Sequence, residues 1–178
     1  MTTIRQYEPK DRPAVERICA GKAGPLKKAF LTCFCNYYIE REPENCFVAA
    51  NEADECVGYV LCASDFQRWA KVFQKEYYGK SWNPVTKGMG KGTVEGLRDF
   101  AGEYPAHLHI DIDDDYQRQG IGTRLIDALT QHLKKNGVKG VMFSVAADNE
   151  KGKNFYNKYG FVELSRNKQE INMGMKLF

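Results

Sequence analysis

The segment from Asp113 to Thr123 combines residue types that can bind a phosphate group through the main chain. Three aspartates and a polar turn lead to two glycines, Gly120 and Gly122, directly before a run with helical apolar spacing. The start of a helix presents unpaired backbone N–H groups and the positive end of the helix dipole, and glycine lets an anion approach the main chain closely. We therefore predict an anion site at this turn.

Two common phosphate motifs are excluded at this turn. Leu125 occupies the position that the third glycine of a G-x-G-x-x-G dinucleotide fingerprint would need, and the turn lacks the Gly-Lys-Ser/Thr of a P-loop. The plain structural alternative is a tight connection between a strand and a helix that binds no ligand.

Hydrophobic spacing predicts the elements that position this turn. Residues 107–113 alternate as a strand, and residues 120–135 place apolar side chains on one face of a helix. A buried strand over 138–146, a helix over 149–159 and strands over 161–164 and 170–177 follow. Because strand-helix-strand crossovers are right-handed, residues 107–113 and 141–146 should form parallel neighbours.

The first half of the chain is predicted to add a strand over 4–7, helices after Pro9 and over 26–39, and a hairpin over 46–51 and 56–63. Residues 64–105 form an insertion between strands that mixes aromatic residues with a glycine-rich run at 87–92. We expect two short helices around a mobile loop there, which either cover the core or form a substrate lid. The fold class is therefore α/β with one central sheet.

Composition limits the classes of partner. The 178 residues are 43% hydrophobic and 28% charged, which suits one soluble domain over 1–178. A net charge of +3, with basic residues spread along the sequence, argues against a nucleic-acid partner. Six cysteines without a CxxC pair, and no signal peptide or long apolar run, indicate buried reduced thiols in a cytoplasmic protein with no membrane partner.

Two motifs carry a resemblance to a known superfamily. The Q-x-x-G-x-G pattern at 117–122 resembles the pyrophosphate loop of the GCN5-related N-acetyltransferases (GNAT). The N-x-x-G-x-x-F-Y-x-x-x-G-F pattern at 149–161 is similar to a second GNAT signature, with Gly152 where alanine is usual. The motifs stand in the family's order, and residues 106–112 and 137–141 also look similar to the acetyltransferase-like domain of O-GlcNAc hydrolases.

The resemblance implies a mixed, mostly antiparallel sheet with a splayed parallel strand pair and flanking helices. It also implies acetyl-CoA as co-substrate, no metal, and by family habit a homodimer. The N–H groups of residues 118–123 would hold the pyrophosphate, and the N–H of Ile112 would polarise the thioester carbonyl. The residues implied to bind acetyl-CoA are Ile112, Asp113, Gln117, Arg118, Gln119, Gly120, Ile121, Gly122, Thr123, Asn149 and Tyr156.

Three residues are candidates for catalysis. Tyr156 matches the tyrosine that protonates the departing thiolate in the family, although it could simply pack in the core, just as Asn149 could simply cap its helix. A protonated amine has a pKa of about 10.4, so a base is needed. Asp111 is our first choice as base or amine anchor and His109 the second. The bulge usual in the superfamily would change which strand residues face the site.

The pattern His107-x-His109-x-Asp111 also matches a metal-ligand spacing, but we interpret it as a decoy. The other histidine, His132, lies inside the helix predicted over 120–135, so the further distant histidines that such metal sites use are missing. The predicted function is transfer of acetyl from acetyl-CoA to a primary amine of a small molecule or peptide. The alternative is a non-catalytic module that binds acetyl-CoA or a protein through residues 66–82.

Overall fold

The strands form a mixed sheet in which β-strands of both halves of the chain lie side by side. The computed structural model describes residues 2–21 and 23–178, and within these residues seven strands lie in the order β1-β2-β3-β4-β5-β7-β6. The strands are β1 (Thr3–Gln6), β2 (Phe47–Ala50), β3 (Cys56–Ala63), β4 (Ala106–Ile112), β5 (Gly140–Ala146), β6 (Val162–Arg166) and β7 (Glu170–Lys176). Among the strand pairs of this described part of the chain, only β4 and β5 run parallel. The predicted fold class is confirmed.

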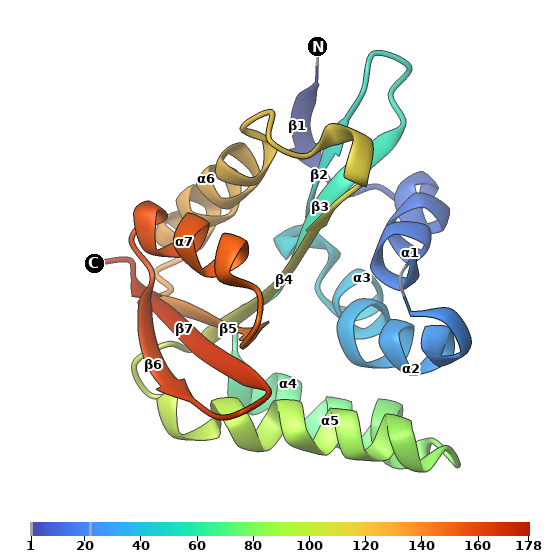
Figure 1. Cartoon of the computed structure of the whole chain (residues 1–178), viewed down its shortest axis with the longest axis vertical. Helices are drawn as coiled ribbons and strands as arrows, with labels where there is room; N and C mark the ends of the chain where they lie inside the picture. Colours follow the sequence, from blue (N-terminus) through green and yellow to red (C-terminus); the bar gives the residue numbers. More distant parts are fainter. Residues whose placement is uncertain (1, 22) are drawn as a thin grey trace.

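Helices cover both faces of this sheet (Figure 1). The helices are α1 (Arg12–Ala20), α2 (Lys27–Leu31), α3 (Tyr37–Arg41), α4 (Phe66–Val72), α5 (Pro84–Leu97), α6 (Ile121–Lys135) and α7 (Glu150–Tyr159). Helices α1 to α5 pack on one face, and α6 and α7 pack on the other. The apolar face predicted for 120–135 is confirmed, because Leu125, Leu129 and Leu133 are fully buried.

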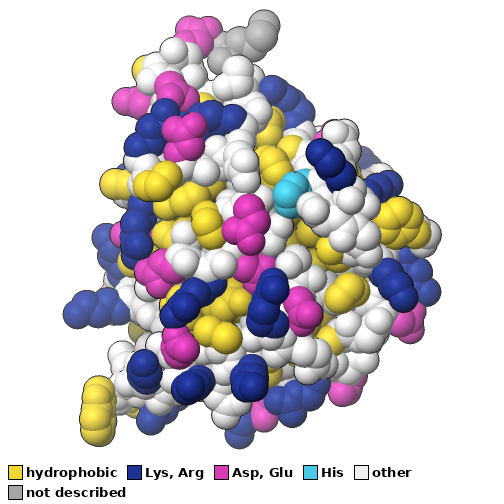
Figure 2. Space-filling view, turned by 180° about the vertical axis from the view of Figure 1, so that it is seen from behind, with side chains coloured by type: hydrophobic (Ala, Val, Ile, Leu, Met, Phe, Trp, Pro, Cys, Tyr) yellow, Lys and Arg dark blue, Asp and Glu magenta, His cyan; other side chains and the backbone are white. Residues whose placement is uncertain are grey.

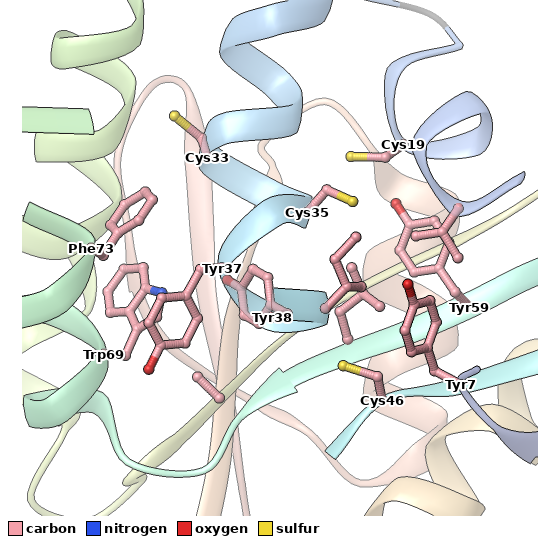
Figure 3. Packing of buried hydrophobic residues seen from close by; sticks show 14 of the residues in the cluster. Tyr7, Cys19, Cys33, Cys35, Tyr37, Tyr38, Cys46, Tyr59, Trp69 and Phe73 are labelled. Atoms are coloured by element: carbon pink, nitrogen blue, oxygen red, sulfur yellow. The ribbon is translucent and has the colours of Figure 1, made fainter. Parts of the chain in front are cut away.

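Aromatic residues of the insertion form much of the core on the α1 side. Trp69 and Phe73 are fully buried and stack with ring centroids 4.7 Å apart, and Tyr37 of α3 meets Trp69 edge to face (Figure 3). Segment 64–105 therefore covers the sheet with packed side chains. Its role as a substrate lid stays a prediction.

The glycine-rich run at 87–92 is helical, so the mobile loop expected there is wrong. Asn83 caps α5, since its Oδ1 accepts the N–H of Val85 at 2.8 Å, and Pro84 occupies the first turn. A Cβ added at Gly90 would collide with the ring of Tyr78. Glycine in this helix therefore permits close packing onto an aromatic residue instead of marking a break.

The helix predicted over 26–39 is confirmed, with a π-helical turn at Thr32–Asn36 between α2 and α3. That turn places Cys33 and Cys35 in the core. All six cysteines are free and buried, as predicted. None of the helices in 2–21 and 23–178 combines the length and the apolar character that crossing a membrane requires.

Candidate active site

The parallel strands β4 and β5 are paired over only two residues each. Ala106 is opposite Val141 and His107 is opposite Met142. Toward their C-terminal ends β4 remains paired with β3 and β5 remains paired with β7, while their inner edges diverge (Figure 1). Beyond His107 and Met142, the main-chain groups on the facing edges of β4 and β5 are therefore not paired with each other. This is the splayed strand pair that the GNAT resemblance implies.

The direction of the backbone groups on β4 follows from one hydrogen bond. The N–H of Asp113 donates to the carbonyl of Val57 in β3 at 2.9 Å. Because N–H groups alternate in direction along a strand, those of Ile110 and Ile112 point toward β5. The N–H of Ile112 donates to Oδ1 of Asp111 at 2.9 Å. The group expected to polarise a thioester carbonyl thus faces the diverging edge, with a carboxylate as its present acceptor.

The turn after β4 presents its main chain outward. Arg118 and Gly120 have positive φ angles of 62° and 74°, and α6 starts at Ile121. The first helical bond runs from the N–H of Arg124 to the carbonyl of Gly120 at 3.2 Å. In the described part of the chain, the backbone N–H groups of residues 118–123 have no hydrogen-bond acceptor. These groups and the helix dipole supply the features that an anion site requires.

The side chains of two predicted ligands hold the turn together. Nε2 of Gln117 donates to the carbonyl of Ile112 at 3.1 Å and to Oδ1 of Asp114 at 2.9 Å. Nε2 of Gln119 donates to the carbonyl of Asp115 at 3.2 Å. These amides brace the turn against the end of β4, and they leave the main chain of the turn available for an anion.

The two glycines of the turn serve different purposes. A Cβ at Gly120 would meet no heavy atom within 4 Å, so the positive φ alone favours glycine at this position. A Cβ at Gly122 would lie 3.2 Å from Cζ of Phe155 and 3.5 Å from Cδ1 of Ile112. Gly122 therefore lets α6 pack closely against α7 and the end of β4.

Tyr156 lies among aromatic rings on the α6 side of the sheet. Its ring centroid is 4.3 Å from that of Phe143 and 5.1 Å from that of Phe155. Burial raises the pKa of Tyr156, and the nearby charge of Asp111 raises it further. The phenol is therefore protonated at neutral pH, as a proton donor must be. The carboxylate of Asp111, near the end of β4, is close enough to affect its pKa.

Asn149 caps α7. Its Oδ1 accepts the N–H of Gly152 at 2.9 Å. A Cβ at Gly152 would lie only 2.7 Å from Nδ2 of Asn149, so glycine at this position fits the capping side chain. The cap occupies Oδ1 of this exposed amide, so the capping alternative for Asn149 is realised, and its contact with coenzyme stays a prediction.

The bulge expected in β4 is absent from the described β3–β4 pair. Six consecutive register pairs run without a shift from His107 opposite Ala63 to Ile112 opposite Gly58. His107, His109 and Asp111 therefore share one face, since alternate residues of an unbroken strand point the same way. A register shift occurs in the neighbouring β2–β3 pair, where Ala49 is opposite Gly58 but Ala50 is opposite Cys56.

His109 is held in a defined orientation by its neighbours. Its Nδ1 lies 3.1 Å from the hydroxyl of Tyr59, and its ring stacks on Phe34 with centroids 5.1 Å apart. The side chain of Cys19 is also a neighbour of Tyr59 (Figure 3). Burial lowers the pKa of His109 to about 4, so the imidazole is neutral at neutral pH.

His107 belongs to the core. Its Nε2 lies 2.7 Å from the hydroxyl of Tyr38, its ring centroid is 4.1 Å from that of Trp69, and burial lowers its pKa to about 3. His132 contacts Oδ1 of Asn45 at 2.8 Å through Nε2. The residues in 2–21 and 23–178 include no group of three or more His, Cys, Asp or Glu placed to hold a metal ion.

A pocket of about 200 Å³ lies between α1 and the end of β4. Three aspartates, Asp111, Asp113 and Asp114, line one side, and Arg17 of α1 lines the other. Nη1 of Arg17 is 2.7 Å from Oδ2 of Asp113. Asp113, predicted to contact acetyl-CoA, thus ties the turn to α1. Among the described lining residues, three carboxylates face one guanidinium, and Ile112 belongs to the same lining.

Sequence reasoning missed Tyr59, Phe34 and Arg17. Tyr59 lies within an apolar strand where nothing distinguishes it, and only the register that sets it opposite Asp111 reveals its role. Phe34 reaches His109 from the π-helical turn. No local pattern marks either contact.

The comparisons with known proteins agree with this geometry. A family model described as "Acetyltransferase (GNAT) family" matches residues 14–161. The chain belongs to this family. N-alpha-acetyltransferase 30 of Schizosaccharomyces pombe is 25% identical over 166 residues, which cover 93% of this chain and 87% of that protein. As a member of the GNAT family, the 178-residue chain is itself an acetyl-CoA-dependent acyltransferase.

Two further likenesses extend the comparison. The solved structure titled SsHAT superposes with a TM-score of 0.89 and 28% identity, covering 99% of this GNAT chain and 98% of that one. Protein O-GlcNAcase of Mus musculus is 24% identical over 187 residues, which span 92% of this chain but 20% of that protein. The predicted likeness to O-GlcNAc hydrolases is therefore confirmed for one part of such a protein.

Proposed function

We propose that this GNAT protein transfers the acetyl group of acetyl-CoA directly to a primary amine, with the α-amine of a peptide as the first acceptor class to test. The observation that carries the proposal is the set of backbone N–H groups at 118–123, which lack acceptors in the described structure, beside the diverging edges of β4 and β5. A diphosphate fits the first feature and an extended pantetheine arm fits the second. The name of the S. pombe relative supports the α-amine.

Asp111 and Ile112 act together in this proposal. Acetyl-CoA supplies the activated acetyl group. The carboxylate of Asp111 accepts the N–H of Ile112 at 2.9 Å and also lines the acidic pocket. When the carboxylate turns to an amine in that pocket, the N–H of Ile112 becomes available to the acetyl carbonyl. In other enzymes, removing one such preorganised donor raises the activation barrier by about 2.7–4 kcal/mol. Because amine binding would free the N–H of Ile112, this donor becomes available in complexes that also hold the amine.

Tyr156 donates the proton to the leaving thiolate. Its raised pKa keeps the hydroxyl protonated until a strong base forms beside it. Asp111 anchors the amine or removes its proton, and the neutral imidazole of His109 is the second base. Both side chains lie on the face of β4 that carries the pocket.

Coenzyme binding is the first test. Acetyl-CoA at concentrations far above a micromolar dissociation constant should raise the melting temperature, because a ligand that binds only the folded state stabilises it. Desulfo-CoA, which keeps the diphosphate, should raise it as well. An unchanged melting temperature with both compounds would overturn the proposal at its first step.

Turnover is the second test. Release of free CoA is measured with peptides that carry a free α-amine, the same peptides with a blocked α-amine, polyamines, aminoglycosides and amino sugars. Acetylation of any amine supports the proposed enzymatic activity. Loss of CoA release with the blocked peptide identifies the α-amine as the acceptor group. Coenzyme binding without turnover of any acceptor would favour the non-catalytic module instead.

A further inference from the structure

The segment that contains α4 and α5 concentrates the positive charge of the protein. Residues 66–97 include six basic residues and two acidic residues, Glu76 and Glu95, so their excess of four exceeds the +3 of the whole chain. The rest of the chain is therefore net negative. The basic residues are Arg68, Lys71, Lys75, Lys80, Lys87 and Lys91.

Most of this charge is not neutralised by neighbouring carboxylates. Arg68 pairs with Glu42 at 3.0 Å and Lys91 pairs with Glu95 at 3.7 Å, whereas Glu76 pairs with Arg41 outside the segment. Four exposed lysines have no ion-pair partner in the described part of the chain, and we call them the lysine face: Lys71, Lys75, Lys80 and Lys87. Figure 2 shows Lys and Arg side chains gathered along the lower end of the molecule, where α4 lies.

An exposed tryptophan stands beside the lysine face. Trp82 is 98% exposed, whereas Trp69, the other tryptophan of the chain, is fully buried. Such complete exposure of the largest apolar side chain is uncommon in a folded protein. Val85 is also exposed. Two large apolar side chains therefore project into water within one turn of chain, close in sequence to Lys80 and Lys87.

The main chain around Trp82 is fixed. The N–H of Ser81 donates to the carbonyl of Tyr78 at 3.1 Å, and the N–H of Asn83 donates to Oγ of Ser81 at 3.2 Å. The carbonyl of Thr86, just beyond, accepts the thiol of Cys33 at 3.7 Å. The indole is thus presented by an anchored turn, so little ordering is needed when it is buried against a partner.

We propose that the lysine face and Trp82 dock on an anionic lipid surface. Lysines are attracted to anionic headgroups as point charges, and tryptophan partitions to the headgroup level of a bilayer. A nucleic-acid surface is less well matched, because arginine dominates specific phosphate and base contacts and the one arginine of this segment is already paired with Glu42. The proposal revises the prediction of no membrane partner, since it concerns peripheral docking.

The two tryptophans provide the test. The protein is mixed with vesicles of equal parts phosphatidylserine and phosphatidylcholine, and with phosphatidylcholine alone. With the anionic vesicles, tryptophan emission should shift to the blue and acrylamide quenching should fall, because Trp82 leaves water. Trp82→Phe leaves only the buried Trp69 and should abolish both changes. No shift and no co-sedimentation with anionic vesicles would overturn the proposal.

Charge variants separate docking from other causes. Lys71→Gln with Lys75→Gln should weaken vesicle partitioning about fivefold for each lysine removed. The matched control replaces two exposed lysines of α6, Lys134→Gln with Lys135→Gln, and should partition like the unchanged protein. Equal loss in both pairs would contradict a defined face. Binding to a single-stranded oligonucleotide but not to vesicles would also overturn the lipid assignment. Retained stabilisation by acetyl-CoA in every variant keeps this test independent of the proposed function.

Discussion

The hydroxyl of Tyr59 lies 3.1 Å from Nδ1 of His109, and the same tyrosine is opposite Asp111 in the β3–β4 register. One buried phenol therefore reaches the side chain of one candidate base and is the direct strand partner of the other. Its pKa is raised by burial, so it remains a neutral hydrogen-bonding group. Tyr59 therefore positions the imidazole of His109, which lies on the face of β4 that carries the pocket.

Replacing Tyr59 by phenylalanine should lower the free energy of unfolding by about 1–3 kcal/mol, because Nδ1 of His109 loses its partner in a buried setting. Urea unfolding measures this change. Tyr78→Phe is the matched control, since it removes the hydroxyl of another largely buried tyrosine that has no hydrogen-bond partner among the described residues. Similar small effects in both variants would show that the Tyr59 hydroxyl does not hold His109.

Tyr156→Phe should lower the rate of CoA release by about 10²–10⁴-fold, the contribution typical of a general acid. The dissociation constant for acetyl-CoA, measured by calorimetry, should stay the same because the ring packing on Phe143 is kept. An unchanged rate would remove Tyr156 from the chemistry and leave it as a core residue.

Gly120→Ala should weaken acetyl-CoA binding and lower the free energy of unfolding by about 1–2 kcal/mol, because a side chain at φ 74° is strained. Gly137→Ala is the control: its φ is 72°, and a Cβ there also meets no atom within 4 Å. Gly137 follows α6, so the same strain occurs away from the turn. Equal coenzyme affinity in the two variants would argue against an anion site at 118–123.

The free energy of unfolding should fall as the pH drops below about 6.5. His107 and His109 have folded pKa values of about 3 and about 4, below the unfolded value near 6.5. The unfolded state therefore binds protons first, and each histidine removes up to about 1.4 kcal/mol per pH unit between pH 6.5 and its folded pKa. Urea titrations from pH 7 to pH 4 measure the slope, and His109→Asn should remove one histidine's share. A flat profile would show that both rings ionise freely in the folded protein.

The sequence was most informative where local spacing decides structure. The apolar positions of α6 and the alternation in β4 predicted both elements and the turn between them. The glycines at 120 and 122 predicted an anion site at the turn, and the positive φ of Gly120 is a main-chain requirement that the sequence can signal. Local rules failed at the run over 87–92, where packing of Gly90 on Tyr78 outweighs the low helix propensity of glycine.

The side-chain arrangement of the site depends on contacts that no spacing reveals. Tyr59 and Phe34 come from two distant elements, and they meet at His109 only after the sheet and the π-helical turn have formed. The facing of His109 and Asp111 depends on the unbroken β3–β4 register, where family habit predicted a bulge. Those features are set by tertiary packing.

The short pairing of β4 with β5 leaves two strand edges open inside the sheet instead of at its rim. In the proposed complex the pantetheine arm completes the sheet like an inserted eighth strand, so ligand removal should expose amide protons to rapid exchange at the inner edges. Open edges are also templates for self-association. In the proposed complex the bound coenzyme therefore also shields these edges from other chains.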